Sequence, residues 1–121
     1  MIIKRGFIYL AALDPVIGNE IAKTRPVAVI SNDKNNEFSG TVTVLPLTSK
    51  NLRKIYPFEV YLGKGTGNLP KNSKVKADQI RTLDKSRLVK LIGELGIKEI
   101  KAIEKALKIH LTLESKSGSA T

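Results

Sequence analysis

The sequence predicts a mainly β fold, an SH3-like small barrel of short strands followed by a short helix and a C-terminal helix. Short apolar runs separated by Gly, Pro, Asn and Asp dominate the first 83 residues, as in a β meander or small barrel. Apolar residues then recur at steps of three and four, the spacing of one helix face. The 121 residues match the length of one domain, and we expect a single domain over 1–114.

The expected strands lie where β-branched and aromatic residues gather between turn-forming residues. They are residues 2–12, 25–31, 41–47, 57–62 and 73–83. The segments between them are expected to be loops, at 14–24, 32–40, 48–56 and 63–72.

Helical spacing begins after the last expected strand. A short helix is expected on Leu88, Leu91 or Ile92, and Leu95. A longer C-terminal helix is expected on Ile100, Ile103, Leu107 and Leu111. The small polar residues 115–121 predict a disordered tail.

Charge is the strongest compositional signal. The formal net charge is +10, and residues 49–90 hold eleven Lys or Arg against three acidic residues. Such a concentration attracts polyanions, of which nucleic acid is one. With no cysteine, the chain has no disulfide, thiolate metal site or cysteine nucleophile. No apolar run approaches the roughly 20 residues that span a bilayer, so we expect a cytoplasmic protein without a membrane partner.

Two polar side chains stand at strand ends marked by proline. Arg25 precedes Pro26, which fits the first position of a strand because it has no N–H to give to a ladder. Thr48 follows Pro46 at the end of the next expected strand. If the two strands form a hairpin turning near residues 36 and 37, residues whose numbers sum to about 73 face each other. Arg25 and Thr48 would then converge.

An arginine and a hydroxyl at one point suit a phosphodiester. The planar guanidinium can hold two phosphate oxygens, and the hydroxyl donates one further hydrogen bond. In RNA the neighbouring 2′-hydroxyl can itself attack phosphorus, so such a site needs neither metal nor protein nucleophile. The single histidine excludes a mechanism that needs two imidazoles.

At this point the sequence resembles the MazF/PemK family of toxin endoribonucleases, the mRNA interferases. The resemblance rests on four motifs that occur in the family's order. They are RGFIYLAALDP (5–15), GNEIAKTRPVAVIS (18–31), VTVLPLTS (42–49) and KADQIRTLDKSRL (76–88). It implies a CcdB/PemK-like barrel, a homodimer, and metal- and cofactor-free, sequence-specific cleavage of single-stranded mRNA to 2′,3′-cyclic phosphate and 5′-hydroxyl ends. It also implies inhibition by an acidic antitoxin of a type II system.

The same resemblance indicates the functional residues. The family's catalytic arginine and threonine correspond to Arg25 and Thr48. Independently of the resemblance, Glu20 in the loop before Arg25 is a candidate either for deprotonating the 2′-hydroxyl or for orienting Arg25. The RNA groove is expected to include Gly18, Asn19, Ser49, Lys50, Asn51, Arg53, Lys54 and Gln79, and no metal ligands are expected. Phe7 and Ala12 stand where family members usually carry acidic residues. Neither position matches a residue that handles the phosphate, so the difference bears on the path or the sequence preference of the RNA.

Two other functions fit part of the sequence. A toxin on the same barrel could poison gyrase through its C-terminal end, although the Arg-Pro and Pro-x-Thr motifs disfavour this reading. A non-catalytic RNA-binding barrel would need only the basic charge.

Overall fold

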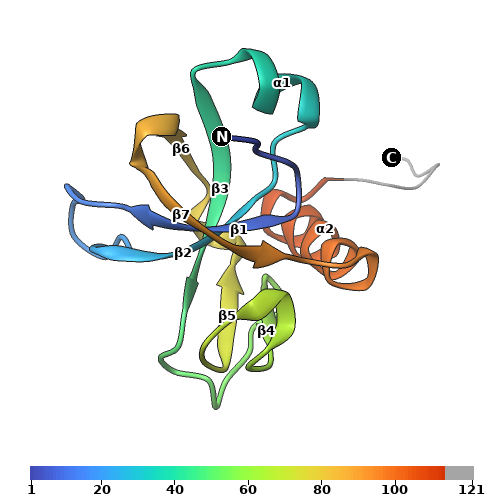
Figure 1. Cartoon of the computed structure of the whole chain (residues 1–121). Coiled ribbons are helices and arrows are strands. Elements are labelled where there is room, and N and C mark those ends of the chain that lie inside the picture. Colours follow the sequence, from blue (N-terminus) through green and yellow to red (C-terminus); the bar gives the residue numbers. More distant parts are fainter. Residues whose placement is uncertain (114–121) are drawn as a thin grey trace.

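A strongly curved antiparallel sheet forms the body of the computed structural model, which describes residues 1–113 (Figure 1). The strands in this part of the chain are β1 (Phe7–Ala12), β2 (Thr24–Val29), β3 (Thr41–Thr48), β4 (Glu59–Leu62), β5 (Ser73–Lys76), β6 (Arg81–Asp84) and β7 (Leu88–Glu94). The α-helices are α1 (Asp33–Phe38) and α2 (Ile97–Leu111). The expected mainly β fold with a C-terminal helix is confirmed, and the tail expected at 115–121 lies outside the described residues.

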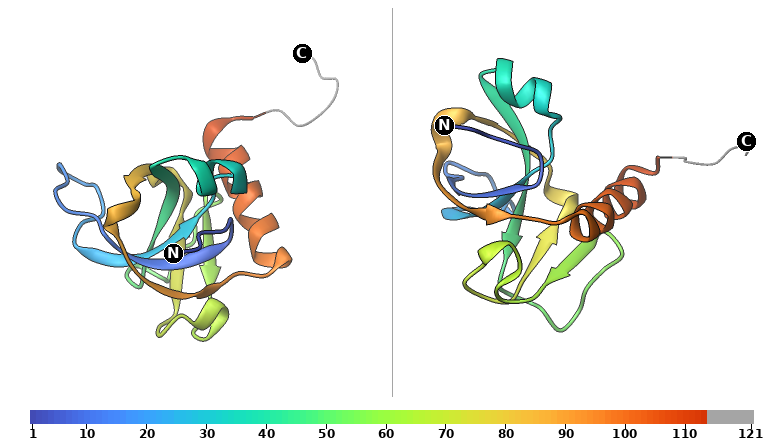
Figure 2. Two further views of the ribbon diagram at one scale, coloured as in Figure 1. Left: turned by 45° about the horizontal axis from the view of Figure 1, so that its top comes forward. Right: turned by 45° about the vertical axis from the view of Figure 1, so that its right-hand side comes forward.

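Strand β3 is the centre of the sheet. It pairs with β2 along one edge, and along the other edge it pairs first with β6 and then, at Leu47 and Thr48, with β5. The path of neighbouring strands is β4-β5-β3-β2-β1-β7. Because β5 and β6 leave the same edge of β3 in succession, β4 and β5 lie apart from β6, and α2 lies alongside β4 (Figure 2).

The register between β2 and β3 agrees with the predicted one. Val27 faces Pro46, and Ala28 faces Leu45, so the residue numbers of each pair sum to 73. The turn that sets this register is not an open loop, because it contains α1. Asn32 caps this short helix by accepting a hydrogen bond from the backbone N–H of Asn35 at 2.8 Å.

Both faces of the curved sheet are buried. Tyr9 and Val27 belong to one core cluster, while their neighbours Ile8 and Ala28 belong to the other. The second cluster is completed by Ile103 of α2, which makes the C-terminal helix part of the core. Each fully buried aliphatic side chain stabilises the fold by about 1.5–3 kcal/mol.

Helix α2 begins three residues before the first residue expected from its periodicity. Gly96 caps it, and the backbone N–H of Gly96 donates to Glu99 Oε1 at 3.1 Å. The helix ends at Leu111, and Thr112 follows in the left-handed region with φ 54°. Among residues 1–113 no helix has both the length and the apolar character needed to cross a membrane.

The short helix expected over Leu88–Leu95 is wrong, because residues 88–94 form strand β7. This strand pairs with β1, and the pairing shifts register twice, between Ile8 and Tyr9 and between Leu10 and Ala11. Each shift inserts a residue and moves the next apolar side chain away from strict alternation. Apolar spacing of three and four therefore occurs here in an irregular strand.

Two other expected strands are shorter than predicted. The strand expected over 2–12 begins only at Phe7, after Gly6 adopts a φ of 93°. The strand expected over 73–83 is divided into β5 and β6 by a 3₁₀ turn at Ala77–Gln79. This turn brings Gln79 next to the loop between β1 and β2.

Candidate functional site

A basic cavity of about 430 Å3 opens where β2, β3 and β5 meet two loops. We call these the β1–β2 loop (residues 13–23) and the β3–β4 loop (residues 49–58). The cavity is lined by Asn19, Glu20, Ile21, Ala22, Lys23, Arg25, Thr48, Lys50, Asn51, Lys74, Lys76 and Gln79. Five of these residues are Lys or Arg and one is acidic, so the cavity suits an anionic ligand.

Arg25 enters this cavity from the start of β2. Its Nε donates a hydrogen bond to the carbonyl oxygen of Ala22 at 2.8 Å, which fixes the plane of the guanidinium. Among the described residues Arg25 forms no ion pair with Glu20 or Asp14. The two terminal amino groups are therefore available to an anion as a bidentate fork.

Thr48 lies at the end of β3, two residues beyond Pro46. Its Oγ1 accepts a hydrogen bond from the backbone N–H of Lys50 at 3.1 Å. A hydroxyl that accepts through oxygen can still donate its own proton. Thr48 and Arg25 together line both the basic cavity and an adjoining hollow of about 270 Å3, in which Ser49 also lies.

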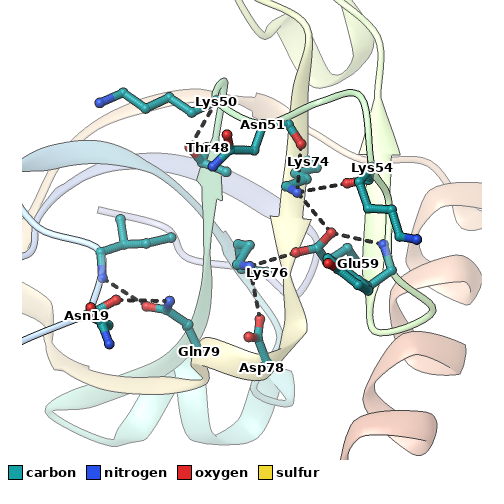
Figure 3. A network of polar contacts seen from close by, with 12 residues as sticks. Asn19, Thr48, Lys50, Asn51, Lys54, Glu59, Lys74, Lys76, Asp78 and Gln79 are labelled. Carbon is teal, nitrogen blue, oxygen red and sulfur yellow. Dashed lines mark hydrogen bonds and ion pairs between the residues drawn. The ribbon is translucent and has the colours of Figure 1, made fainter.

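The β1–β2 loop is held by side chains from the segment that follows β5. Gln79 Oε1 accepts a hydrogen bond from the N–H of Ile21 at 2.9 Å, and its Nε2 lies 3.5 Å from the carbonyl oxygen of Asn19 (Figure 3). Arg81 donates to the carbonyl oxygens of Leu13 and Ile21. The amide of Gln79, a residue that sequence analysis placed in the RNA groove, thus contacts the backbone of this loop.

Arg87 and Asp14 also fix this loop at its base. Arg87 Nη1 donates to the carbonyl oxygens of Ala12 and Asp14. Asp14 Oδ1 accepts from the N–H of Lys23 at 3.0 Å, and so it joins the two ends of the loop. Glu20 is exposed, and its Oε1 accepts from the N–H of Ile17 at 3.1 Å.

A buried ion-pair network, which sequence analysis missed, forms the side of the cavity nearest β5. Lys74 and Lys76 contact the two oxygens of Glu59 at 2.9 and 2.6 Å, and Lys76 also lies 3.7 Å from Asp78 Oδ1 (Figure 3). The Lys-x-Lys alternation on one strand, opposite a lone Glu on a neighbouring strand, was the available sequence signal. In the sequence alone, this alternation is indistinguishable from the general basic charge.

The charges in this network stabilise one another. Burial raises the pKa of Glu59, but hydrogen bonds from Lys76, the Tyr56 N–H and Lys74 outweigh it, so that the net pKa lies below the usual value. Burial likewise lowers the pKa of Lys76, yet its hydrogen bond to Glu59 and the charge of Asp78 raise the net pKa. Both groups are therefore charged at neutral pH.

Many, though not all, of the site residues predicted from the sequence line the cavity. Those that line it are Asn19, Glu20, Arg25, Thr48, Lys50, Asn51 and Gln79. Those outside its lining are Gly18, Ser49, Arg53 and Lys54. Lys54 instead extends over the ring of Tyr56, with Nζ 5.3 Å from the centroid. Within residues 1–113 no three His, Cys, Asp or Glu side chains are grouped as metal ligands would be.

A family model described as PemK-like, MazF-like toxin of type II toxin-antitoxin system matches residues 4–111. The chain belongs to this family. Among its PemK/MazF relatives, Endoribonuclease MazF9 of Mycobacterium tuberculosis is 40% identical over 117 residues, covering 93% of this chain and 98% of that protein. Endoribonuclease MazF of Staphylococcus saprophyticus is 39% identical over 112 residues, covering 93% of each.

Solved structures of PemK/MazF toxins share the fold. MazF from Deinococcus radiodurans superimposes with a TM-score of 0.80 at 28% identity, covering 93% of this chain and 99% of that one. An endoribonuclease from a mycobacterial species in complex with its cognate antitoxin gives a TM-score of 0.77 at 27% identity, covering 93% of this chain and 98% of that one. The likeness therefore extends over both loops of the basic cavity.

Proposed function

We propose that this protein is the toxin of a type II toxin–antitoxin system and acts as a metal-independent, sequence-specific endoribonuclease on single-stranded mRNA. Its membership of the PemK-like, MazF-like family and the endoribonuclease activity named for its relatives support this function. The observation that carries it is the meeting of Arg25 and Thr48, each with a free donor, at one basic cavity.

In the proposed reaction the 2′-oxygen of the substrate attacks the adjacent phosphorus. The bond from phosphorus to the 5′-oxygen breaks, which leaves a 2′,3′-cyclic phosphate and a 5′-hydroxyl. The 2′-hydroxyl loses a proton and the departing 5′-oxygen gains one. Arg25 binds two oxygens of the phosphate and stabilises the charge that develops on them, and Thr48 donates to the same group.

Glu20 is the proposed acceptor of the 2′-hydroxyl proton. It is the carboxylate in the lining of the basic cavity, whereas a guanidinium is permanently protonated near neutral pH and is therefore a poor base. The hydrogen bond from Ile17 engages only Oε1, so Oε2 can accept the proton.

The RNA is proposed to run along the two loops that border the cavity. Asn19, Lys50 and Asn51 would contact the nucleotides next to the scissile phosphate, since they share the cavity with Arg25. Gly18, Ser49, Arg53, Lys54 and Gln79 are proposed to extend or support this groove. Cations along it would bind successive phosphates.

The proposed partners are an acidic antitoxin and a second copy of the chain. The mycobacterial relative bound to its cognate antitoxin supports the first. An acidic segment would bind in the same basic groove as the RNA and would block cleavage by occupying it. A cytoplasmic location, where mRNA is present, fits these partners, and sedimentation equilibrium would measure the proposed homodimer.

The deciding experiment uses a long unstructured RNA in excess EDTA. Wild type, Arg25→Ala and Lys101→Ala are compared, because Lys101 is an exposed lysine on α2 outside the cavity lining. We expect discrete cuts with cyclic-phosphate ends from wild type and Lys101→Ala, and intact RNA with Arg25→Ala. Circular dichroism confirms that each variant is folded.

The other outcomes separate the alternatives. Salt-dependent binding by wild type without strand scission would support a non-catalytic RNA-binding barrel. Inhibition of gyrase with intact RNA would support a gyrase poison. A folded Arg25→Ala protein that cuts at the wild-type rate would overturn the proposed mechanism.

A further inference from the structure

Lys74 is a buried lysine directly beside the proposed catalytic threonine. It lies on β5, where it is the ladder partner of Thr48, and its side chain is only 4% exposed. Its Nζ donates to the carbonyl oxygens of Asn51 at 2.9 Å and Lys54 at 3.1 Å, and it contacts Glu59 Oε1 at 2.9 Å (Figure 3). The buried ammonium is thus surrounded by three oxygen atoms, two of which accept hydrogen bonds from it.

Glu59 extends the same set of contacts. Its side chain is fully buried, and its Oε1 also accepts the backbone N–H of Tyr56 at 3.0 Å. Lys74 and Glu59 therefore bind the β3–β4 loop at three backbone positions: Asn51, Lys54 and Tyr56.

The other hydrogen bonds of the loop lie near its ends, where the Lys50 N–H donates to Thr48 Oγ1 and the Phe58 carbonyl oxygen accepts from the Ala77 N–H. Of residues 49–58 only Leu52 and Phe58 are half-buried, and the other side chains are exposed. The loop contains no strand or helix, and Asn51 adopts a left-handed φ of 55°. Because most side chains of the loop are exposed, the polar contacts to Lys74 and Glu59 are what hold its middle part, from Asn51 to Tyr56.

We propose that Lys74 and Glu59 form a positioning pair that holds the β3–β4 loop in place as one wall of the RNA groove. This inference rests on the proposed function for its catalytic consequence, because Lys50 and Asn51 of the loop line the same cavity as Arg25. Lysine side chains are rarely buried, and those that are need polar partners. The burial of Lys74 among loop carbonyl oxygens and Glu59 therefore indicates a specific structural role.

The direct test is limited trypsin digestion of the folded protein without RNA. The β3–β4 loop contains three trypsin sites, at Lys50, Arg53 and Lys54, and mass spectrometry measures cleavage at each. Lys74→Met is compared with Lys76→Met, which removes the other lysine bound to Glu59 and leaves both loop carbonyl contacts in place. We expect cleavage in the loop to accelerate at least about tenfold in Lys74→Met and to stay at the wild-type rate in Lys76→Met.

The conservative variant separates positioning from general stability. Lys74→Arg keeps the charge and the donors, so we expect it to restore much of the protection that Lys74→Met loses. If Lys74→Met does not fold, Lys74→Arg and Glu59→Gln carry the same comparison. Wild-type protection in Lys74→Met, or equal exposure in Lys76→Met, would overturn the proposal.

Kinetics then test the consequence for RNA cleavage. Loss of a loop that binds substrate should raise KM about tenfold, and kcat should fall by a smaller factor, because the Lys50 N–H of the loop also orients Thr48. A fall confined to kcat would contradict a role in positioning the loop. Failure of the proposed function would appear separately, as wild type without cleavage, whereas the trypsin result depends on the loop alone.

Discussion

Arg25 and Thr48 each make one hydrogen bond to the backbone and keep further donors for a ligand, namely the two terminal amino groups of Arg25 and the hydroxyl proton of Thr48. The Nε of Arg25 is bound to Ala22, and the Oγ1 of Thr48 is bound to Lys50. Each side chain is thereby oriented before any substrate arrives. Such preorganised donors stabilise developing charge without a cost of reorganisation during the reaction.

Replacement of Thr48 by residues of similar shape tests its hydroxyl. We expect Thr48→Val to slow cleavage by about 100- to 1,000-fold, the usual effect of losing one donor to a developing oxyanion, and Thr48→Ser to keep most of the rate. Single-turnover kinetics, with enzyme in excess over RNA, measure the rate of the cleavage step directly. Equal rates for Thr48→Val and wild type would exclude a role for the hydroxyl.

Glu59 predicts how stability depends on pH. The pKa of Glu59 is lowered in the folded protein, so its ionised form contributes stability above the usual carboxyl pKa of about 4.3. That contribution falls as the pH drops through the lower folded pKa. We expect the stability advantage of wild type over Glu59→Gln to be constant near neutral pH and to shrink in acid. Urea unfolding of both proteins from pH 7 to pH 3 measures it, and an advantage that grows in acid would contradict the assignment.

At the scale of elements, the sequence pattern predicted the strands with regular pairing and missed the strand whose pairing is irregular. The β2–β3 register followed from Pro26, Pro46 and the turn between them, because a two-residue alternation allows few alternatives. Strand β7 was missed because its pairing with β1 shifts register twice, and such shifts depend on contacts that no local pattern encodes.

Gly93 in β7 marks one of these irregular contacts. A Cβ at this position would lie against the backbone carbonyl of Gly67 and within 2.9 Å of Asn68 Cβ. We expect Gly93→Ala to destabilise the protein by about 1–3 kcal/mol through overpacking, whereas Gly40→Ala, with no atom within 4 Å, should change it by less than about 0.5 kcal/mol. Thermal or urea unfolding compares the two variants. Equal stabilities would show that β7 can move away from the backbone at Gly67 and Asn68.

At the scale of the whole molecule, the net positive charge favours a polyanionic ligand. The sequence alone indicated a polyanion, an arginine and threonine at one point, and the family whose members unite these features. It could not indicate the buried network of Lys74, Lys76 and Glu59, because whether a lysine is solvated or paired depends on strands that are distant in sequence. The sequence also placed Gln79 in the RNA groove, but it could not indicate that the amide would contact the backbone of the β1–β2 loop.

Salt dependence of RNA binding tests the role of this charge. In the Arg25→Ala background, which is expected to bind without cutting, log Kobs should fall linearly with log salt concentration. Adding Lys50→Ala should reduce the slope by about 0.7, the value for one phosphate contact on a single strand, while adding Lys101→Ala should leave it unchanged. Fluorescence anisotropy at several salt concentrations measures these slopes. Equal slopes with and without Lys50 would remove Lys50 from the phosphate contacts.

Both walls of the basic cavity are attached to one short stretch of chain, residues 73–87. Lys74 holds the β3–β4 loop, while Gln79, Arg81 and Arg87 hold the β1–β2 loop. The loops that would touch RNA are thus not independent modules. An engineer who exchanges them between related toxins, in order to change the cleavage sequence, would have to transplant this stretch with them, because grafted loop carbonyls would otherwise find no matching donors.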